Sequence, residues 1–392
     1  MNRGNFFRRT LLTLFTVSIM LFASVTHAEI YTGEGSYLMS KAETLEVARE
    51  RAKADAMRNA SEQAGVYVKS YARMKNFELE EDIIETMTAN ILKLIGNPNF
   101  SPLKEVDNLE GVLIHVVVKV QIDDSDINQW LNKNEQEKSE LVAQNESLRK
   151  ANAEQERQIA ELKRQLANNP QEQEEITKKF DDEDKIFLSN QKVDEASKLF
   201  YQGDYNGAIK LHDEALNLNP NNELAYYGRG TIYGELGQYE QAIQDLNKTL
   251  QLNSNNSYAY YNRGRIYILQ QQYERAIQDY NKAIQLNPND SDVYYNRGNA
   301  YQGLMQYEQA IQDYSKAIKI NPNDAVAYYN RGFIYCRLRN FKQAIADVNK
   351  SIELGLNNAA CYQLRGFCYQ QLGDMAKAQS DFAKANELGY NG

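Results

Sequence analysis

A period of 34 residues dominates the second half of the chain. The 204 residues from Ser189 to Gly392 divide into six units of this length. The segment YYNRGRIYILQQQYERAIQDYNKAIQLNP of the third unit returns in the fourth as YYNRGNAYQGLMQYEQAIQDYSKAIKINP. A repeat this short cannot bury an apolar face alone, so its copies must stack into a solenoid. We place the units at 189–222, 223–256, 257–290, 291–324, 325–358 and 359–392.

Two positions in every unit hold small side chains. The eighth residue is Ala or Gly, and the twentieth is Ala. Small residues let the two helices of a unit approach closely, and Asn-Pro pairs such as Asn287-Pro288 end the second helix. This pattern resembles the tetratricopeptide repeat family over residues 189–392. The resemblance implies a mainly α chain with a six-repeat solenoid, in which the first helix of each unit lines a concave groove.

Five units carry an Arg at the seventh place and an Asp 16 residues later. The first unit lacks both and has Glu195 and Leu211 instead. Because the two residues are present or absent together, we expect an ion pair between the helices of each unit rather than two solvated charges. The expected pairs are Arg229 with Asp245, Arg263 with Asp279, Arg297 with Asp313, Arg331 with Asp347, and Arg365 with Asp381.

Tyr and Asn recur on the face of the first helix that the resemblance places in the groove. Tyrosine rings and asparagine amides suit an extended protein segment, because amides bond to its backbone and rings pack on its side chains. A glycan is the alternative ligand, since sugar rings stack on aromatic side chains. A third interpretation is that the tyrosines only support neighbouring units. The candidate groove residues are Tyr227, Tyr261, Asn262, Arg265, Tyr295, Asn296, Asn299, Tyr329, Asn330 and Phe333.

The sequence offers little material for catalysis. It has three His and three Cys, and it contains no phosphate-binding glycine loop, nucleophile elbow, HExxH or CxxC pair. We therefore expect no catalytic residue, no cofactor and no metal site. The net charge of −9 disfavours nucleic acid and an anionic bilayer as partners.

Residues 1–28 have the composition of a secretory signal. Three Arg precede an apolar run from Leu11 to Phe22, and Thr26-His27-Ala28 forms a small-residue cleavage site. The run has 12 residues, fewer than the roughly 20 of a spanning helix. We expect cleavage to leave a periplasmic or secreted protein with no stable membrane insertion. A retained leader that acts as an anchor is the alternative.

The three cysteines, Cys336, Cys361 and Cys368, fall in the last two units. Cys361 and Cys368 lie seven residues apart on one expected helix. Their Cα atoms are then about 10.5 Å apart, too far for a disulfide. We favour small buried thiols, and a Cys336–Cys368 disulfide across neighbouring helices is the alternative.

Residues 29–128 are expected to form a small α+β domain. The patterns predict helices over 45–65 and 78–95, a strand at 66–71, and a half-buried strand at 112–120 hairpinned through 107–111. The order β-α-β-α-β-β, with GEGSYLMSKAETLEVARERAKADAMRNASEQAGVYV at its head, resembles the N-terminal domain of the flagellar assembly protein T type. That resemblance implies an envelope-associated binding domain. His115 has no second ligand near it in the sequence, and we expect a structural histidine.

Residues 132–169 lack Gly and Pro and repeat apolar side chains at heptad spacing. We interpret them as a short parallel coiled coil that would make a homo-oligomer, with a single spacer helix as the alternative. Residues 170–188 are rich in Glu and Asp and are interpreted as a flexible acidic hinge. The expected seam consists of Leu141, Asn145, Leu148, Asn152, Gln155, Ile159, Leu162 and Leu166.

Together these features predict a non-enzymatic scaffold outside the cytoplasm. The solenoid would bind a protein or peptide partner in its groove, and the first domain would tether it to an envelope or surface complex. The alternative is a carbohydrate-binding adaptor for an exported polysaccharide or the cell wall.

Overall fold

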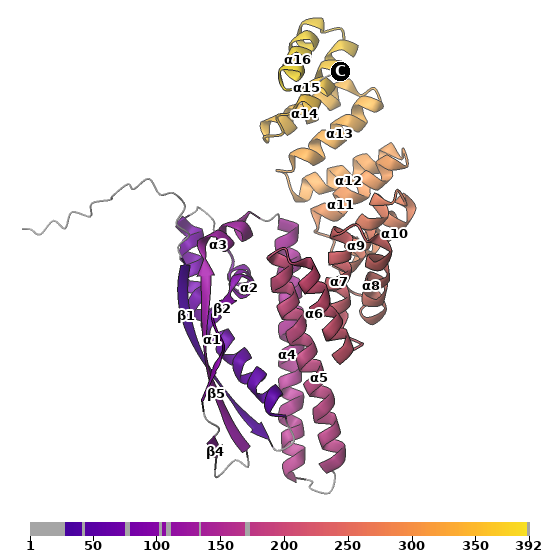
Figure 1. Ribbon diagram of the computed structural model, residues 1–392. Helices are drawn as coiled ribbons and strands as arrows, with labels where there is room; N and C mark the ends of the chain where they lie inside the picture. Colours follow the sequence, from indigo (N-terminus) through magenta and orange to yellow (C-terminus); the bar gives the residue numbers. More distant parts are fainter. Residues whose placement is uncertain are drawn as a thin grey trace, which may run out of the picture.

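The computed structural model describes residues 28–40, 44–74, 79–101, 104–106, 111–132, 135–168 and 173–389. Most of the predicted signal, residues 1–27, lies outside the described residues. A sheet with its helices lies at one end, a long helical hairpin follows, and a curved stack of helical pairs extends from the hairpin (Figure 1). The predicted mainly α fold, with a repeat solenoid after a small β-containing region, is confirmed.

The sheet is built on two long antiparallel strands. β1 (Ala28–Ser40) pairs with β5 (Gly111–Asp123) over the full length of both strands. Short strands cover the other edge of β5, namely β2 (Lys93–Leu94), β3 (Asn99–Phe100) and β4 (Lys104–Val106). The alternating residues predicted at 112–120 form the core-facing side of β5, where Val116, Val118 and Val120 are buried.

Helix α1 (Leu45–Met74) lies on the sheet at unusually close range. Ala residues recur every four positions on its buried face, and Ala52 and Ala56 are fully buried there. A Cβ atom added to Gly33 would lie 2.0 Å from the carbonyl oxygen of Ala56, and one added to Gly35 would lie 2.3 Å from that of Ala52. Only glycine therefore fits at these two positions of β1.

The strand predicted at 66–71 is wrong, because these residues continue α1. Val68 is fully buried and Tyr71 is 7% exposed, so residues with high strand propensity serve the buried face of a helix instead. Helix α2 (Glu81–Ile91) is shorter than predicted, since the chain leaves it at Leu92 to form β2. Helix α3 (Asp124–Leu131) follows β5 directly and places Trp130 in the core.

Side chains of α1 form hydrogen bonds with backbone groups at the outer edge of β1. The backbone N–H of Ser36 donates to Asp55 Oδ2 at 3.2 Å, and Asn59 Nδ2 donates to the carbonyl of Glu34 at 2.6 Å. These contacts satisfy groups that would otherwise be free to pair with a further strand. His115 lies on β5 with its Nδ1 atom 2.9 Å from Ser36 Oγ, as expected of a structural histidine.

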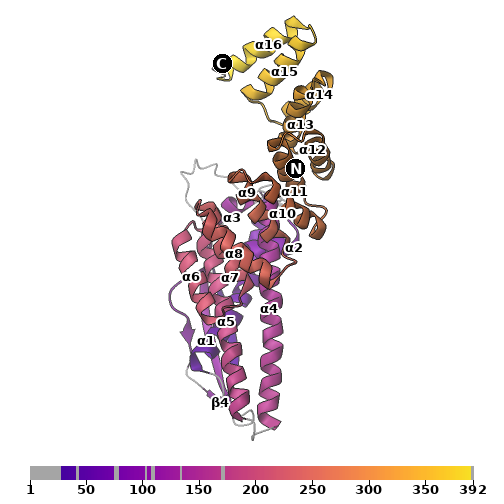
Figure 2. The same cartoon turned by 90° about the vertical axis from the view of Figure 1, so that its right-hand side faces the viewer.

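Helices α4 (Glu135–Asn168) and α5 (Gln173–Tyr201) form an antiparallel hairpin, seen side by side in both ribbon views (Figures 1 and 2). Ile159 and Leu162 of α4 pack on Ile176 and Phe180 of α5. Gln155 Nε2 donates to the carbonyl of Glu183 at 2.6 Å. The residues of the predicted seam therefore pack against other parts of the same chain. Their described side chains are not available to pair with a second copy in the predicted parallel coiled coil.

The flexible hinge predicted at 170–188 is also wrong, since residues 173–188 belong to α5. Asp184 is 5% exposed and lies 2.9 Å from Arg51 of α1. Arg51 also donates to the Tyr37 hydroxyl at 2.8 Å, and its guanidinium lies 5.0 Å from the centre of the Phe187 ring. Part of the acidic composition of this segment is therefore a buried ion pair that joins the hairpin to the sheet layer. The acidic composition alone suggested a segment with solvent-exposed side chains. The spacing of Ile176, Phe180 and Asp184, four residues apart, is instead typical of one face of a helix.

Helix α5 continues without a break into the first helix of the first repeat. The last residue of each of the first five units caps the following helix, as Asp290 Oδ1 does by accepting from the N–H groups of Asp292 and Val293 at 3.0 and 3.4 Å. The six units are α5 with α6 (Tyr205–Leu218), α7 (Glu223–Glu235) with α8 (Tyr239–Leu252), α9 (Ser257–Leu269) with α10 (Tyr273–Leu286), α11 (Ser291–Gly303) with α12 (Tyr307–Ile320), α13 (Ala325–Arg337) with α14 (Phe341–Glu353), and α15 (Ala359–Gln371) with α16 (Met375–Glu387).

The five expected Arg–Asp pairs are all formed between the helices of one unit. The shortest nitrogen–oxygen distances are 2.7 Å for Arg229–Asp245, 2.6 Å for Arg263–Asp279, 2.6 Å for Arg297–Asp313, 2.8 Å for Arg331–Asp347 and 2.7 Å for Arg365–Asp381. Each Asp accepts two hydrogen bonds from its Arg, one on each carboxylate oxygen. These hydrogen bonds raise the pKa of Arg229 and of Arg365 above the usual arginine value.

Candidate partner-binding groove

A ladder of tyrosine–asparagine hydrogen bonds runs along the first helices of the units. The Nδ2 atom of Asn262 donates to the Tyr227 hydroxyl at 3.0 Å. The same contact recurs from Asn296 to Tyr261 at 3.2 Å and from Asn330 to Tyr295 at 3.0 Å. Each contact joins one unit to the next, so these tyrosines do support their neighbours, as one of the sequence interpretations held.

The first half of the groove is closed. Tyr227 is 4% exposed, Asn262 is 5% exposed and Tyr261 is 6% exposed. Tyr261 packs on Tyr280 with ring centres 6.1 Å apart, and burial raises its pKa. The prediction of an open binding surface is therefore wrong at these three groove residues.

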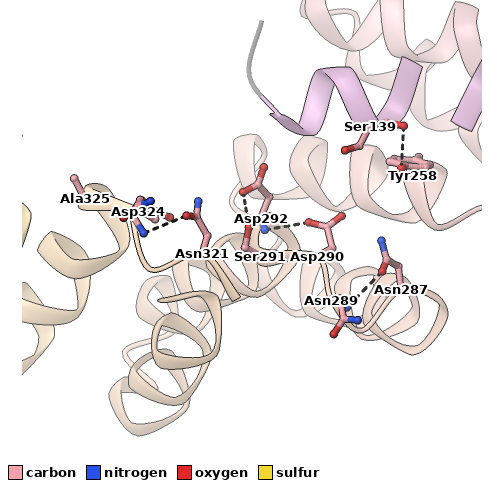
Figure 3. A pocket seen from close by; sticks show the side chains of 11 residues that line it. Ser139, Tyr258, Asn287, Asn289, Asp290, Ser291, Asp292, Asn321, Asp324 and Ala325 are labelled. Atoms are coloured by element: carbon pink, nitrogen blue, oxygen red, sulfur yellow. Dashed lines mark hydrogen bonds between the residues drawn. The ribbon is translucent and has the colours of Figure 1, made fainter. Parts of the chain in front are cut away.

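Helix α4 covers this half of the groove. Glu140 accepts a hydrogen bond from the Tyr227 hydroxyl and another from Asn262 Nδ2 at 3.2 Å. The Tyr258 hydroxyl of α9 donates to the carbonyl of Ser139 at 3.2 Å, as Figure 3 shows. The segment around Ser139 and Glu140 belongs to the same chain. It therefore occupies the place of a bound ligand against α7 and α9. No pattern in the sequence singled out these contacts, because they join residues about 90 to 120 positions apart.

The second half of the groove is more open. The groove residues of α11 and α13 are half-buried and Phe367 of α15 is exposed, and in the covered half Arg265 of α9 is exposed as well. The Tyr329 hydroxyl has no hydrogen-bond partner among the described residues, because Leu364 occupies the place where earlier units have Asn. The half-buried groove residues are Tyr295, Asn296, Asn299, Tyr329, Asn330 and Phe333.

A pocket of about 480 Å³ lies between the first turns of α4 and the loops that join the third, fourth and fifth units (Figure 3). Asp290, Asp292 and Asp324 line it together with asparagine side chains. Burial, followed by the charges of Asp290 and Asp324, raises the pKa of Asp292. Asp290 and Asp324 cap helices, which gives them a structural role. In the described part of the chain, no group of three or more His, Cys, Asp or Glu residues is arranged to hold a metal ion.

A buried histidine lies beneath the covered half of the groove. His212 of α6 is 1% exposed and lies under Gly228, where an added Cβ would be 2.5 Å from its Nε2 atom. Burial, and to a smaller extent the charge of Arg229, lowers the pKa of His212 to about 3. The imidazole is therefore neutral at physiological pH. Sequence reasoning missed this residue, although Gly228 in place of the Asn of later units was a usable signal.

The three cysteines of the last two units are free and buried. Cys336 and Cys368 pack in one cluster with Ala344. Burial raises the pKa of Cys361. The structure thus has the buried thiols that the sequence favoured.

These repeats define the class of the protein. Family models described as TPR repeat match residues 196–237 and 264–304, and models described as tetratricopeptide repeat match 224–256, 291–324, 246–278, 314–346 and 359–388. The C-terminal half of the chain is a tetratricopeptide repeat solenoid, a fold of protein-interaction scaffolds. These matches do not reach the sheet domain, whose likeness to the flagellar assembly protein T type stays a prediction.

Several solved structures are similar to about half of this chain. One is YrrB, described as a TPR protein with an unusual peptide-binding site, at 21% identity and a TM-score of 0.43, covering 47% of this chain and 94% of that one. Another is pilF of Pseudomonas aeruginosa, at 20% identity and 0.48, covering 53% and 95%. A third is MamA of Desulfovibrio magneticus RS-1, at 25% identity and 0.41, covering 43% and 94%. No curated protein gives a significant match to this chain.

Proposed function

We propose that this protein is a non-catalytic scaffold that binds a segment of a partner protein in the groove of its last three units. One observation carries the proposal, namely that the first half of the same groove already holds a protein segment. Tyr227, Tyr258 and Asn262 bind the stretch of α4 that contains Ser139 and Glu140. The fourth and fifth units present the same residue types, and no helix covers their groove residues in the part of the chain that the structure describes.

The open half has the chemistry of a protein-binding surface. Phe367 is 43% exposed and Phe333 is half-buried, so two aromatic side chains of successive units are available as anchors. The Tyr329 hydroxyl and the neighbouring amide of Asn330 supply polar groups for the backbone of a bound segment. A buried aromatic anchor with polar groups around it is typical of interaction hot spots.

A glycan is a weaker occupant of this groove. The covered half of the groove holds a protein segment, whereas no contact of the described residues favours a sugar over a protein. A protein segment is therefore the ligand in the proposed function.

The same proposal places the scaffold outside the cytoplasm, where the sheet domain would tether it to an envelope complex. Its support is the sequence of residues 1–28, with an arginine-rich start, an apolar run and a small-residue cleavage site. Among the helices described here, none has the length and hydrophobicity needed to cross a bilayer. Mass spectrometry of the purified protein tests the point, because cleavage predicts a mature chain that begins near Glu29. A chain that retains Leu11–Phe22 would contradict it.

Cross-linking tests the binding function in intact cells. A photoreactive residue at Tyr329 or at Phe333 of the full chain should capture the same partner protein. The matched control is Lys282, an exposed residue on the second helix of the third unit, which should capture nothing specific. The purified partner should then bind Phe333→Ala more weakly than the original protein. Equal capture from all three positions, or no capture from the two groove positions, would contradict the proposed function.

A further inference from the structure

The outer edge of β1 is closed along only part of its length. In an antiparallel strand, every second residue points its backbone N–H and carbonyl away from the neighbouring strand. On β1 the N–H of Ser36 and the carbonyl of Glu34 point outward and bind side chains of α1. The carbonyl of Leu38 also points outward and accepts from Lys163 Nζ of α4 at 2.8 Å. Side chains therefore block strand pairing along this part of the edge.

The other part of the edge is open. Ile30 and Thr32 continue the same outward-facing series toward the start of β1, which lies at the edge of the sheet (Figure 1). Their outward N–H and carbonyl groups have no hydrogen-bond partner among the described residues. Each of the two residues therefore offers one donor and one acceptor to a further strand. We call residues 30–32 the open stretch.

Helix α1 runs beside this edge in the opposite direction to β1. Asp55 contacts Ser36 and Asn59 contacts Glu34, so four residues along the helix correspond to two residues back along the strand. Val66 follows Asn59 by about two turns and lies on the same stripe of α1. This spacing places Val66 beside the open stretch.

Apolar surface is uncovered at the open stretch. Ile30 is 60% exposed and Val66 is 70% exposed. A further strand with apolar side chains at alternate positions would cover both. The exposed acids of this part of β1 and α1, Glu34 and Glu62, have no ion-pair partner in the described chain, and Lys119 lies one strand further in, on β5. The local charge therefore favours a strand that carries basic side chains.

We propose that the open stretch of β1 is a docking site for an extended segment of a partner protein, which adds to the sheet as a further strand. This inference rests on the proposed function, because it specifies the surface by which the sheet domain would attach to an envelope complex. The backbone of Ile30 and Thr32 holds the segment, and Val66 packs on its apolar side chains. Its basic side chains lie near Glu34 and Glu62.

A synthetic strand peptide is the probe. It is an octapeptide of alternating Val and Lys that carries fluorescein, and its binding to the full chain is measured by fluorescence anisotropy. We expect saturable binding. The matched peptide of alternating Val and Glu should bind about tenfold more weakly, because its carboxylates would lie near acidic residues.

Two proline variants of β1 assign the binding to the open stretch. Thr32→Pro removes an N–H that points away from β5, so the pairing with β5 is kept, and peptide binding should weaken about tenfold. Ser36→Pro removes an outward N–H from the closed part and should leave binding unchanged. Fluorescence of Trp130, the single tryptophan and a buried residue of the sheet domain, verifies that both variants stay folded.

A side-chain variant tests the site without changing the backbone. Val66→Ser should weaken binding of the Val–Lys peptide about threefold, because part of an apolar side chain is no longer covered. Hydrogen exchange should show that the bound peptide protects the amides of Ile30 and Thr32 and leaves that of Ser36 unchanged.

Three results would each overturn the inference: no binding of the Val–Lys peptide, equal binding of the two peptides, or equal effects of the two proline variants. The cross-linking from Tyr329 and Phe333 judges the proposed function separately, because these residues lie in the repeat array and not on the sheet.

Discussion

Replacing Arg297 with Met should destabilise the fourth unit far more than loss of a surface ion pair would. Arg297 donates from Nε to Asp313 Oδ2 at 2.7 Å and from Nη2 to Oδ1 at 2.6 Å. The Asp313 side chain is 7% exposed and that of Arg297 is 18% exposed. Breaking a buried pair costs about 3–5 kcal/mol, because the remaining charge stays desolvated. Partial exposure of the arginine places the expected loss near the lower limit, at about 3 kcal/mol.

The chain contains a matched control in the next unit. Lys350 and Glu353 lie 3.2 Å apart, with side chains 45% and 66% exposed. Pairs of this kind contribute about 0–1 kcal/mol, so Glu353→Gln should change stability by less than about 1 kcal/mol.

Hydrogen exchange of the full chain is the suitable assay, because a repeat array opens unit by unit and global unfolding need not be two-state. Amide protection in α11 and α12 should fall by about 3 kcal/mol in Arg297→Met. The double variant Arg297→Met with Asp313→Leu should recover most of that loss, since no charge then remains buried. A loss within about 1 kcal/mol for Arg297→Met, equal to the control, would show that the pair is merely solvated.

Three further predictions concern other parts of the fold. His212 has its pKa lowered from 6.5 to about 3 by burial, so the unfolded chain binds the extra proton between these values, and stability should fall as pH drops below about 6.5. The loss is about 2 kcal/mol at about pH 5 in the original chain, and it should be absent in His212→Gln when both are compared by urea denaturation. Asp184→Asn removes the charge partner of buried Arg51 and should lower protection of α1 by about 3 kcal/mol while α13 is unchanged in hydrogen exchange. Met305 has a φ of 57°, where the first two units have Gly203 and Gly237, and Met305→Gly should raise the melting temperature by relieving about 1 kcal/mol of strain. An unaltered melting temperature would contradict this last prediction.

The repeat array was the predictable part of this protein, and the reason is local. Each unit contains the pattern that specifies it, so the period alone predicted the helices and their stacking. The pairing of Arg229 with Asp245 was readable because the two residues vary together along one chain. Both inferences needed only residues less than one unit apart.

Contacts between distant segments were not predictable in this way. Nothing in the spacing of Glu140 indicates that it meets Tyr227 and Asn262, since the position of α4 depends on how the sheet layer and the hairpin pack. The hinge prediction failed for the same reason, because acidic composition cannot reveal that Asp184 meets Arg51. The candidate groove residues lie along the first helices of the units, but the pattern could not show that α4 covers Tyr227 and Asn262.

Helix α5 belongs at once to the hairpin and to the first repeat, and the Arg51–Asp184 pair fixes it to α1. The sheet and the open half of the groove are therefore connected through one continuous helix. If the sheet were attached to a larger assembly, the groove would be held at a fixed distance and orientation from that assembly. The protein would then set the spacing of its partner as well as bind it.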